Sequence, residues 1–344
     1  MHKSFKWLFI SMLFISTLSF GQTTKLTPKQ KIDLIAKMGN LIKEKYVFPQ
    51  KTEKIIKYLE KKHTSNTFMQ TNDPLQFARL MNRYLKKASN DLHLWVGYNP
   101  QEAKSHQVRN YSKYLEEKAR SKNYGFRKVE ILEGNIGYLH MNHFYNPRYS
   151  EQTLASAIHF LSNCDALIID LRKNLGGSIY MVNTLTSYFF DSEILTHRFY
   201  YRSGREQEVF TRKDLVGKSL PKIPLYLLVD HKTASAAEQV AYNLKHLKRA
   251  TIIGEVTIGS ANTGLRHSLD NNFYIFIANG AYQNEVTGDT FENKGVIPQV
   301  KTKSEKALSK AHILALRQRL KLCKEKSQKK KLNELIKRVK KSTK

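Results

Sequence analysis

The apolar residues in the first third of the chain recur at the spacing of amphipathic helices. In residues 29–63 two such series flank the segment Tyr46-Val47-Phe48-Pro49, and residues 75–85 continue the pattern. The apolar positions of the two series are Ile32, Ile35, Met38, Ile42, Ile55, Ile56 and Leu59. Because side chains three and four positions apart share one face of a helix, this spacing predicts a helical N-terminal region. Together with a linker, it is assigned to residues 23–130.

From residue 131 to residue 302 short apolar runs alternate with amphipathic segments. Residues 137–141, 166–171, 225–229, 251–254 and 273–278 are expected to form strands, and residues 154–161, 181–190 and 235–244 are expected to form helices. Alternation of strand and helix is typical of layered α/β folds. The pattern therefore predicts an α/β core.

The last segment, residues 303–344, is expected to be a basic helix followed by a tail. Leu308, Ile313, Leu316 and Leu320 lie at helical spacing, so this helix should pack against the core. From residue 301 to the end there are 17 Lys or Arg and 3 acidic residues, in a chain whose net charge is +29. The segment lacks interleaved aromatic residues that would stack on bases, so we expect no nucleic-acid binding. A solvated tail or contact with the cell envelope fits residues 329–344 better.

The first 22 residues have the organisation of a signal peptide. Lys3 and Lys6 precede an apolar run from residue 7 to residue 18, and small residues follow at Ser19 and Gly21. The run is shorter than the roughly 20 residues that a membrane span needs. The sequence thus predicts a cleavable leader and a secreted or periplasmic protein.

Cysteine and histidine give little sign of structural bridges or metal binding. Cys164 and Cys323 are the two cysteines of the chain, which excludes a disulfide framework, and we expect both to be free thiols. His140 and His143 are three positions apart in an expected strand, where they would point to opposite faces. We therefore expect neither a metal nor a cofactor.

The segment from residue 225 to residue 264 carries the strongest sign of chemistry. An apolar strand leads to Ser235 at the expected start of a helix, where small neighbours leave the hydroxyl uncovered and free backbone N–H groups can stabilise an oxyanion. Ser235 and Glu238 also fit the S-x-x-E capping box, in which the serine only caps the helix. A second buried strand, residues 166–171, leads to Gly176 and Gly177. Paired glycines permit close approach of the backbone to a ligand, or form an ordinary turn.

Four segments, in this order, resemble the family of the tail-specific (C-terminal processing) proteases, the tricorn core protease and the interphotoreceptor retinoid-binding protein. They are residues 135–139 (NIGYL), 170–177 (DLRKNLGG), 233–238 (TASAAE) and 292–298 (ENKGVIP). The resemblance covers residues 34–316 and implies a ClpP/crotonase-like core of β-β-α units. Tail-specific members use a PDZ domain, for which the stretch between His93 and the core is too short. The chain therefore looks like the tricorn-like branch.

The resemblance also implies roles for particular residues. Ser235 stands at the position of the family's nucleophile. In the tail-specific branch a lysine follows the nucleophile by 25 residues, but that position is Ser260 here, so the expected base is His93, as in the tricorn-like branch. Glu292 matches the acid that partners this histidine, and Asp91 is its rival for that role.

The expected chemistry of these residues is consistent with the resemblance. An imidazole suits a general base because its ordinary pKa of about 6.5 lets it accept and return a proton near neutral pH. The resemblance places the oxyanion hole at the backbone N–H groups of Gly176 or Gly177 and of Ala236.

Together these features predict a serine peptidase that hydrolyses peptides or proteins through an acyl-enzyme on Ser235, without metal or cofactor. Two other interpretations stay open. The retinoid-binding relatives keep the scaffold without the chemistry, so the chain can instead be a non-catalytic module that binds small molecules or peptides. The basic tail also suits a protein that acts by contact with the envelope.

Overall fold

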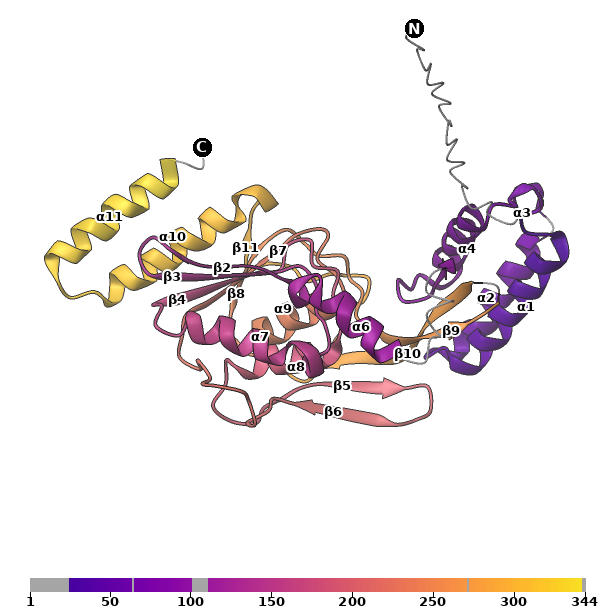
Figure 1. Ribbon diagram of the computed structural model, residues 1–344, viewed down its shortest axis with the longest axis horizontal. Coiled ribbons are helices and arrows are strands. Elements are labelled where there is room, and N and C mark those ends of the chain that lie inside the picture. Colours follow the sequence, from indigo (N-terminus) through magenta and orange to yellow (C-terminus); the bar gives the residue numbers. More distant parts are fainter. Residues whose placement is uncertain (1–24, 64, 101–110, 271, 342–344) are drawn as a thin grey trace, which may run out of the picture.

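The computed structural model describes residues 25–63, 65–100, 111–270 and 272–341, which form two β-sheets with helices packed against them (Figure 1). The expected signal peptide, residues 1–22, lies outside the described residues.

Helices make up most of the N-terminal region. They are α1 (Pro28–Lys45), α2 (Pro49–His63), α3 (Asn66–Gln70) and α4 (Pro74–Ser89). The side chains of Thr27 and Asp73 accept hydrogen bonds from backbone N–H groups in the first turns of α1 and α4. Each of these two helices also has a proline in its first turn. N–H groups of the first turn make no hydrogen bond within the helix, so the proline, which has no N–H, is tolerated there. The sequence thus sets where both helices begin.

The larger sheet forms the core and is mostly parallel. Its strands are β2 (Phe126–Leu132), β3 (Ile136–Met141), β4 (Ala166–Asp170), β7 (Leu225–Val229), β8 (Thr251–Gly254) and β11 (Val300–Lys301). They lie in the order β11-β8-β7-β4-β3-β2, and only the β2–β3 pair is antiparallel. Since β4 and β7 are parallel neighbours, their carboxyl ends meet at one edge of the sheet. The turns that follow these two strands carry the glycines and the serine singled out in the sequence.

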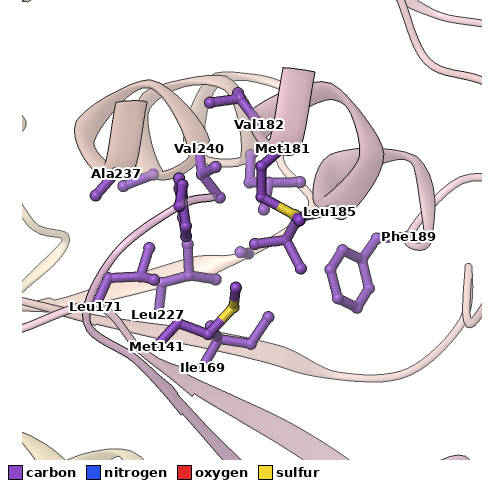
Figure 2. Close-up of a cluster of buried hydrophobic side chains, with 14 of the residues drawn as sticks. Met141, Ile169, Leu171, Met181, Val182, Leu185, Phe189, Leu227, Ala237 and Val240 are labelled. Carbon is purple, nitrogen blue, oxygen red and sulfur yellow. The ribbon is translucent and has the colours of Figure 1, made fainter. Parts of the chain in front are cut away.

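Helices bury both faces of this sheet. On one face lie α7 (Pro147–Phe160), α8 (Ile179–Ser187) and α9 (Ala236–His246), and on the other lies α10 (Ser304–Leu322) (Figure 1). Along β4, Leu167 and Ile169 pack with α7, α8 and α9, whereas Ile168 packs with α10. Figure 2 shows part of the first cluster, where Ile169 and Leu227 of the sheet lie beneath side chains of α8 and α9. Successive residues of a strand point to opposite faces of the sheet, and here both faces are buried. The core strands are therefore continuous apolar runs in the sequence.

The second sheet is antiparallel and joins the core to the N-terminal helices. Its strands are β1 (Trp95–Tyr98), β5 (Leu195–Tyr201), β6 (Glu206–Phe210), β9 (Thr263–Ser268) and β10 (Phe273–Asn284). The first half of β10 packs its residues Phe273 and Ile275 against the N-terminal helices, while Tyr282 near its end belongs to the core cluster. In this sheet the first half of β10 was predicted from the apolar pattern, whereas the β5–β6 hairpin and β9 were not predicted. Short elements also precede β2, namely α6 (Tyr111–Arg120) and the 3₁₀ turn η1 (Asn123–Gly125).

The C-terminal residues form a helical hairpin at the end of the molecule opposite the N-terminal helices (Figure 1). After α10, the chain turns back as α11 (Lys326–Lys341), whose Leu332, Leu335 and Ile336 are buried in the cluster that α10 makes with the sheet. The expectation of a solvated tail over residues 329–344 is therefore wrong for the inner face of α11. Leu335 and Ile336 follow Leu332 by three and four positions, which places all three on one side of the helix. The lysines of α11 remain on its outer side.

The α/β core and the helical N-terminal region predicted from the sequence are confirmed. Cys164 is buried, Cys323 is half-buried, and both are free thiols. Among the helices of the described residues, none combines the length and the hydropathy needed to cross a bilayer.

Candidate functional site

Ser235 lies in a strained turn between β7 and α9. Its backbone φ of 54° and ψ of −124° fall in a region that residues with a side chain rarely adopt. Such a conformation costs about 1–3 kcal/mol and persists only where the surroundings hold it. Ala234 and Ala236 flank the serine, so no large neighbouring side chain of the turn covers its hydroxyl.

The buried carboxylate of Glu238 holds this turn. One of its oxygens accepts hydrogen bonds from Ser235 N at 2.8 Å, Ser260 N at 2.9 Å and Ser260 Oγ at 3.1 Å. Its other oxygen accepts from Gly259 N at 2.6 Å and from the Thr257 hydroxyl. Burial raises the pKa of Glu238, and these donors lower it in part. The glutamate of the S-x-x-E pattern therefore binds the backbone of Ser235, as in a capping box, and the Ser235 hydroxyl has a further neighbour.

That neighbour is His93. Its Nε2 lies 3.2 Å from Ser235 Oγ, which is within hydrogen-bond distance although 142 residues separate the two in sequence. His93 lies in the turn between α4 and β1, and Asp91 Oδ1 accepts a hydrogen bond from His93 N at 2.7 Å, which fixes this turn. Burial lowers the pKa of His93, while the nearby charge of Asp91 partly opposes the shift. The imidazole is thus kept neutral near pH 7, the form that accepts a proton.

Both candidate acids accept hydrogen bonds from residues 261–262, but neither accepts a hydrogen bond from the His93 ring. Asp91 Oδ2 accepts from the Tyr46 hydroxyl at 2.9 Å and from Asn262 Nδ2 at 3.3 Å. Glu292 Oε2 accepts from the backbone N–H groups of Ala261 at 2.6 Å and Asn262 at 3.3 Å. His93 Nδ1 and Glu292 Oε1 are both buried without a hydrogen-bond partner in the described part of the chain.

Glu292 has an unusual protonation equilibrium. Its pKa is raised to about 7, chiefly by burial and also by the charge of Asp91, while the N–H groups of Ala261 and Asn262 act in the opposite direction. Near neutral pH this side chain is therefore a mixture of carboxylic acid and carboxylate.

Tyr46 is a site residue that the sequence analysis missed. It directly follows the last residue of α1 and is fully buried, and in the sequence it appears only as part of the apolar segment between two helices. Its hydroxyl reaches Asp91 from a segment 45 residues away, which no local pattern announces.

The glycine turn after β4 lies directly against the serine turn. A Cβ atom on Gly176, whose φ is +87°, would come within 2.8 Å of Ala234 O and Ala236 N, so only glycine fits there. Asn174 fixes the two turns relative to each other, because its backbone carbonyl accepts from Ala234 N at 2.9 Å and its side chain accepts from Gly176 N at 2.8 Å.

This arrangement narrows the choice of oxyanion donors. The N–H of Gly176 is occupied by Asn174, whereas in the described part of the chain the N–H groups of Gly177 and Ala236 have no protein acceptor. Of the glycine pair, Gly177 is therefore the donor that remains available to a ligand.

Asp230, at the end of β7, gives a second link between these turns. Its Oδ1 accepts hydrogen bonds from Lys173 N and Lys232 N, each at 3.0 Å. Thr233, next to Ala234, donates from its hydroxyl to Leu171 O at 2.9 Å. Asp230 and Thr233 thus connect the two turns through hydrogen bonds to backbone groups.

The described residues contain no group of three or more His, Cys, Asp or Glu side chains arranged to hold a metal ion.

The pKa of Glu292 predicts a pH-dependent effect on stability. The folded pKa of about 7 lies above the ordinary 4.5, so the stability that this group contributes is present below about pH 4.5 and is lost as the pH rises through 7. The side chain of Glu292→Gln stays neutral, so the variant should melt at a higher temperature than wild type, slightly at pH 5 and more at pH 8. The gain in free energy of unfolding over wild type should differ between the two pH values by on the order of 3 kcal/mol. Circular dichroism melts at each pH measure this.

Glu116→Gln, at an exposed position of α6, is the control for loss of a glutamate charge. A melting-temperature gain of Glu292→Gln that is constant from pH 5 to pH 8 would show that Glu292 does not titrate in this range.

Two family descriptions match the chain. Residues 135–302 match "Peptidase family S41", and residues 26–127 match "N-terminal domain of Peptidase_S41 in eukaryotic IRBP". Ser235 and Glu292 lie in the first range and His93 lies in the second.

The chain is also similar to curated proteases. It is 29% identical over 175 residues to the carboxy-terminal-processing protease of Bartonella bacilliformis, a match that covers 49% of this chain and 39% of that protein. It is 27% identical over 172 residues to the carboxy-terminal processing protease CtpA of Bacillus subtilis, covering 50% of this chain and 36% of the relative. Each match spans less than two-fifths of the relative's length.

Solved structures share the fold at low sequence identity. A lipoprotein from Streptococcus agalactiae gives a TM-score of 0.57 at 18% identity, covering 85% of this chain and 98% of that chain. The photosystem II D1 C-terminal processing protease gives 0.51 at 15% identity, covering 81% and 94%, and the tricorn protease gives 0.53 at 12% identity, covering 90% and 37%. These structures show the same fold. The two family matches confirm the resemblance seen in the sequence, and the chain belongs to peptidase family S41.

Proposed function

We propose that this protein is a serine peptidase in which Ser235 is the nucleophile and His93 the general base. The observation that carries the proposal is the 3.2 Å approach of His93 Nε2 to Ser235 Oγ. The relatives' names, which describe proteases, support peptide bonds as the target.

The proposed reaction has two halves. His93 Nε2 takes the proton of the Ser235 hydroxyl as Oγ attacks the peptide carbonyl carbon, and the carbonyl oxygen becomes an oxyanion facing the N–H groups of Gly177 and Ala236. The imidazolium then gives its proton to the leaving amine, which leaves an acyl-enzyme on Ser235. A water molecule, deprotonated by His93, hydrolyses that ester and restores both side chains.

The acid in this proposal acts on the imidazolium. Asp91 favours the charged form of His93, so its carboxylate stabilises the cation that forms during each half of the reaction. We keep Glu292 as the orienting acid, because Oε1 of Glu292 and Nδ1 of His93 are both buried without partners among the described residues, and a bond between them would satisfy both.

A second candidate function is a binding module on the same scaffold. It is favoured by one observation, namely that the ring Nδ1 of His93 has no acidic partner in the described residues. Such a protein would hold a peptide or small molecule near Ser235 without cleaving it.

The location and the division of the chain also belong to this proposal. We propose that residues 1–22 are a cleaved signal peptide, so that the protein is secreted or periplasmic, and that residues 23–130, 131–302 and 303–344 form the helical region, the peptidase core and the basic C-terminal segment. The exposed lysines of α11 support contact of that segment with the anionic envelope surface.

Replacement of the nucleophile separates the two candidate functions. Ser235→Ala should lower kcat/KM for peptide hydrolysis by at least about a thousandfold without loss of folding, because the acyl-enzyme cannot form. The measurement is release of a fluorophore from a mixed peptide library by wild type and variant, with circular dichroism to check folding. Ser156→Ala, on the exposed side of α7, is the control. Equal turnover by wild type and Ser235→Ala would refute Ser235 as nucleophile, and no turnover by wild type would favour the binding module.

The lowered pKa of His93 predicts the acid side of the pH profile. A base must be deprotonated, so activity falls as the pH drops through the pKa of His93, and burial places that pKa below the ordinary 6.5. In Glu292→Gln, which removes the group with a pKa of about 7, we expect kcat/KM to stay near that variant's maximum at pH 6.5 and to fall only at lower pH. A rate profile of this variant from pH 4.5 to pH 8 measures this, and an acid limb centred above 6.5 in it would contradict the environment assigned to His93.

A further inference from the structure

An open groove begins at the proposed oxyanion donor. Its lining includes Tyr201 of β5, Asn279 of β10 and Thr263 of β9 in the second sheet, together with Gly177 just before α8 and Tyr180 in its first turn. Gly177 follows the glycine that touches the serine turn, and Thr263 follows Asn262, whose side chain binds Asp91. The groove therefore adjoins the Ser235 site at two points of its lining, Gly177 and Thr263.

Among the described residues that line this groove, one side chain is charged. Arg205 lies at the turn of the β5–β6 hairpin, which Figure 1 shows running beneath the core toward the N-terminal helices. The other groove residues are neutral, and several of them, such as Tyr180 with 63% exposure and Leu265 with 57%, present open apolar surface. The groove thus combines apolar surface with one positive charge.

The guanidinium of Arg205 is held in place by neutral partners. Its carbon lies 4.3 Å from the centre of the Tyr201 ring, and its Nη2 donates to Gln207 Oε1 at 3.3 Å. The same Gln207 oxygen accepts from the Tyr201 hydroxyl at 3.0 Å, so the three side chains fix one another. None of the ion pairs among the described residues includes Arg205. Its charge is oriented but not neutralised.

We propose that Arg205 binds a carboxylate of the peptide substrate and so sets the specificity of the groove. An arginine fork matches a carboxylate with two parallel hydrogen bonds, and a guanidinium held by a tyrosine ring loses little freedom when it binds. The carboxylate is an Asp or Glu side chain or the α-carboxylate at the peptide's end, since both present the same two oxygens. This inference rests on the proposed peptidase function, because that function puts a peptide in the groove.

The test compares matched fluorogenic peptides. In one pair Glu is replaced by Gln at each position within three residues of the cleaved bond, and in the other a free C-terminus is replaced by an amide. Wild type should prefer the acidic member of at least one pair, and Arg205→Gln should reduce that preference in kcat/KM about fivefold, mainly through KM. Arg205→Lys should restore part of it. The pair that responds identifies the source of the carboxylate.

Arg202→Gln is the matched control, because Arg202 is in the same hairpin turn, carries the same charge and does not line the groove. An equal reduction with Arg202→Gln would show a general effect of charge, and an unchanged preference with Arg205→Gln would overturn the proposal. If wild type cleaves no peptide, the peptidase function fails, but the inference about Arg205 is still decided. Fluorescence anisotropy then measures whether Ser235→Ala binds the acidic peptides more tightly than Ser235→Ala/Arg205→Gln does.

Discussion

The placement of the Ser235 hydroxyl depends on one buried carboxylate. Glu238 collects hydrogen bonds from the serine turn and from residues 257–260, and so stabilises a backbone conformation that would otherwise relax. Ser260 contributes to this network from the position where the resemblance would put a lysine in tail-specific members, and its Oγ lies 3.0 Å from Ser235 N. In this chain that position supports the backbone of Ser235, so in the proposed peptidase the activation of the Ser235 hydroxyl has to come from another part of the molecule.

That part is the helical N-terminal region. The turn after α4 carries His93, and β10 packs one half against the N-terminal helices and the other half in the core. Asp91 is held from both sides, by Tyr46 of the N-terminal region and Asn262 of the core. The distance between His93 and Ser235 is therefore set by the packing of two regions that are far apart in sequence. Changes at their interface should affect chemistry even where they touch neither side chain.

The sequence allowed some of this architecture to be predicted, for physical reasons that differ between elements. The N-terminal helices have regular apolar spacing and capping residues, and the parallel strands are buried on both faces, so each was predictable from local pattern. The β5–β6 hairpin was missed because β6 has no buried residue and both strands carry charged residues. The many lysines of α11 led to the prediction of a solvated tail, although three apolar residues on its inner face are buried. His93 and Glu292 were named from a family resemblance, whereas Tyr46 and the occupied N–H of Gly176 follow only from three-dimensional contacts.

The central claim is that the His93 imidazole makes the Ser235 hydroxyl reactive. Mass spectrometry of the purified protein after treatment with a fluorophosphonate tests it most directly, because this reagent forms a covalent bond with an activated serine. We predict one adduct, located on the proteolytic fragment that contains Ser235, and none in a folded His93→Ala variant. An adduct on another residue, or one that persists in His93→Ala at the wild-type rate, would contradict the account.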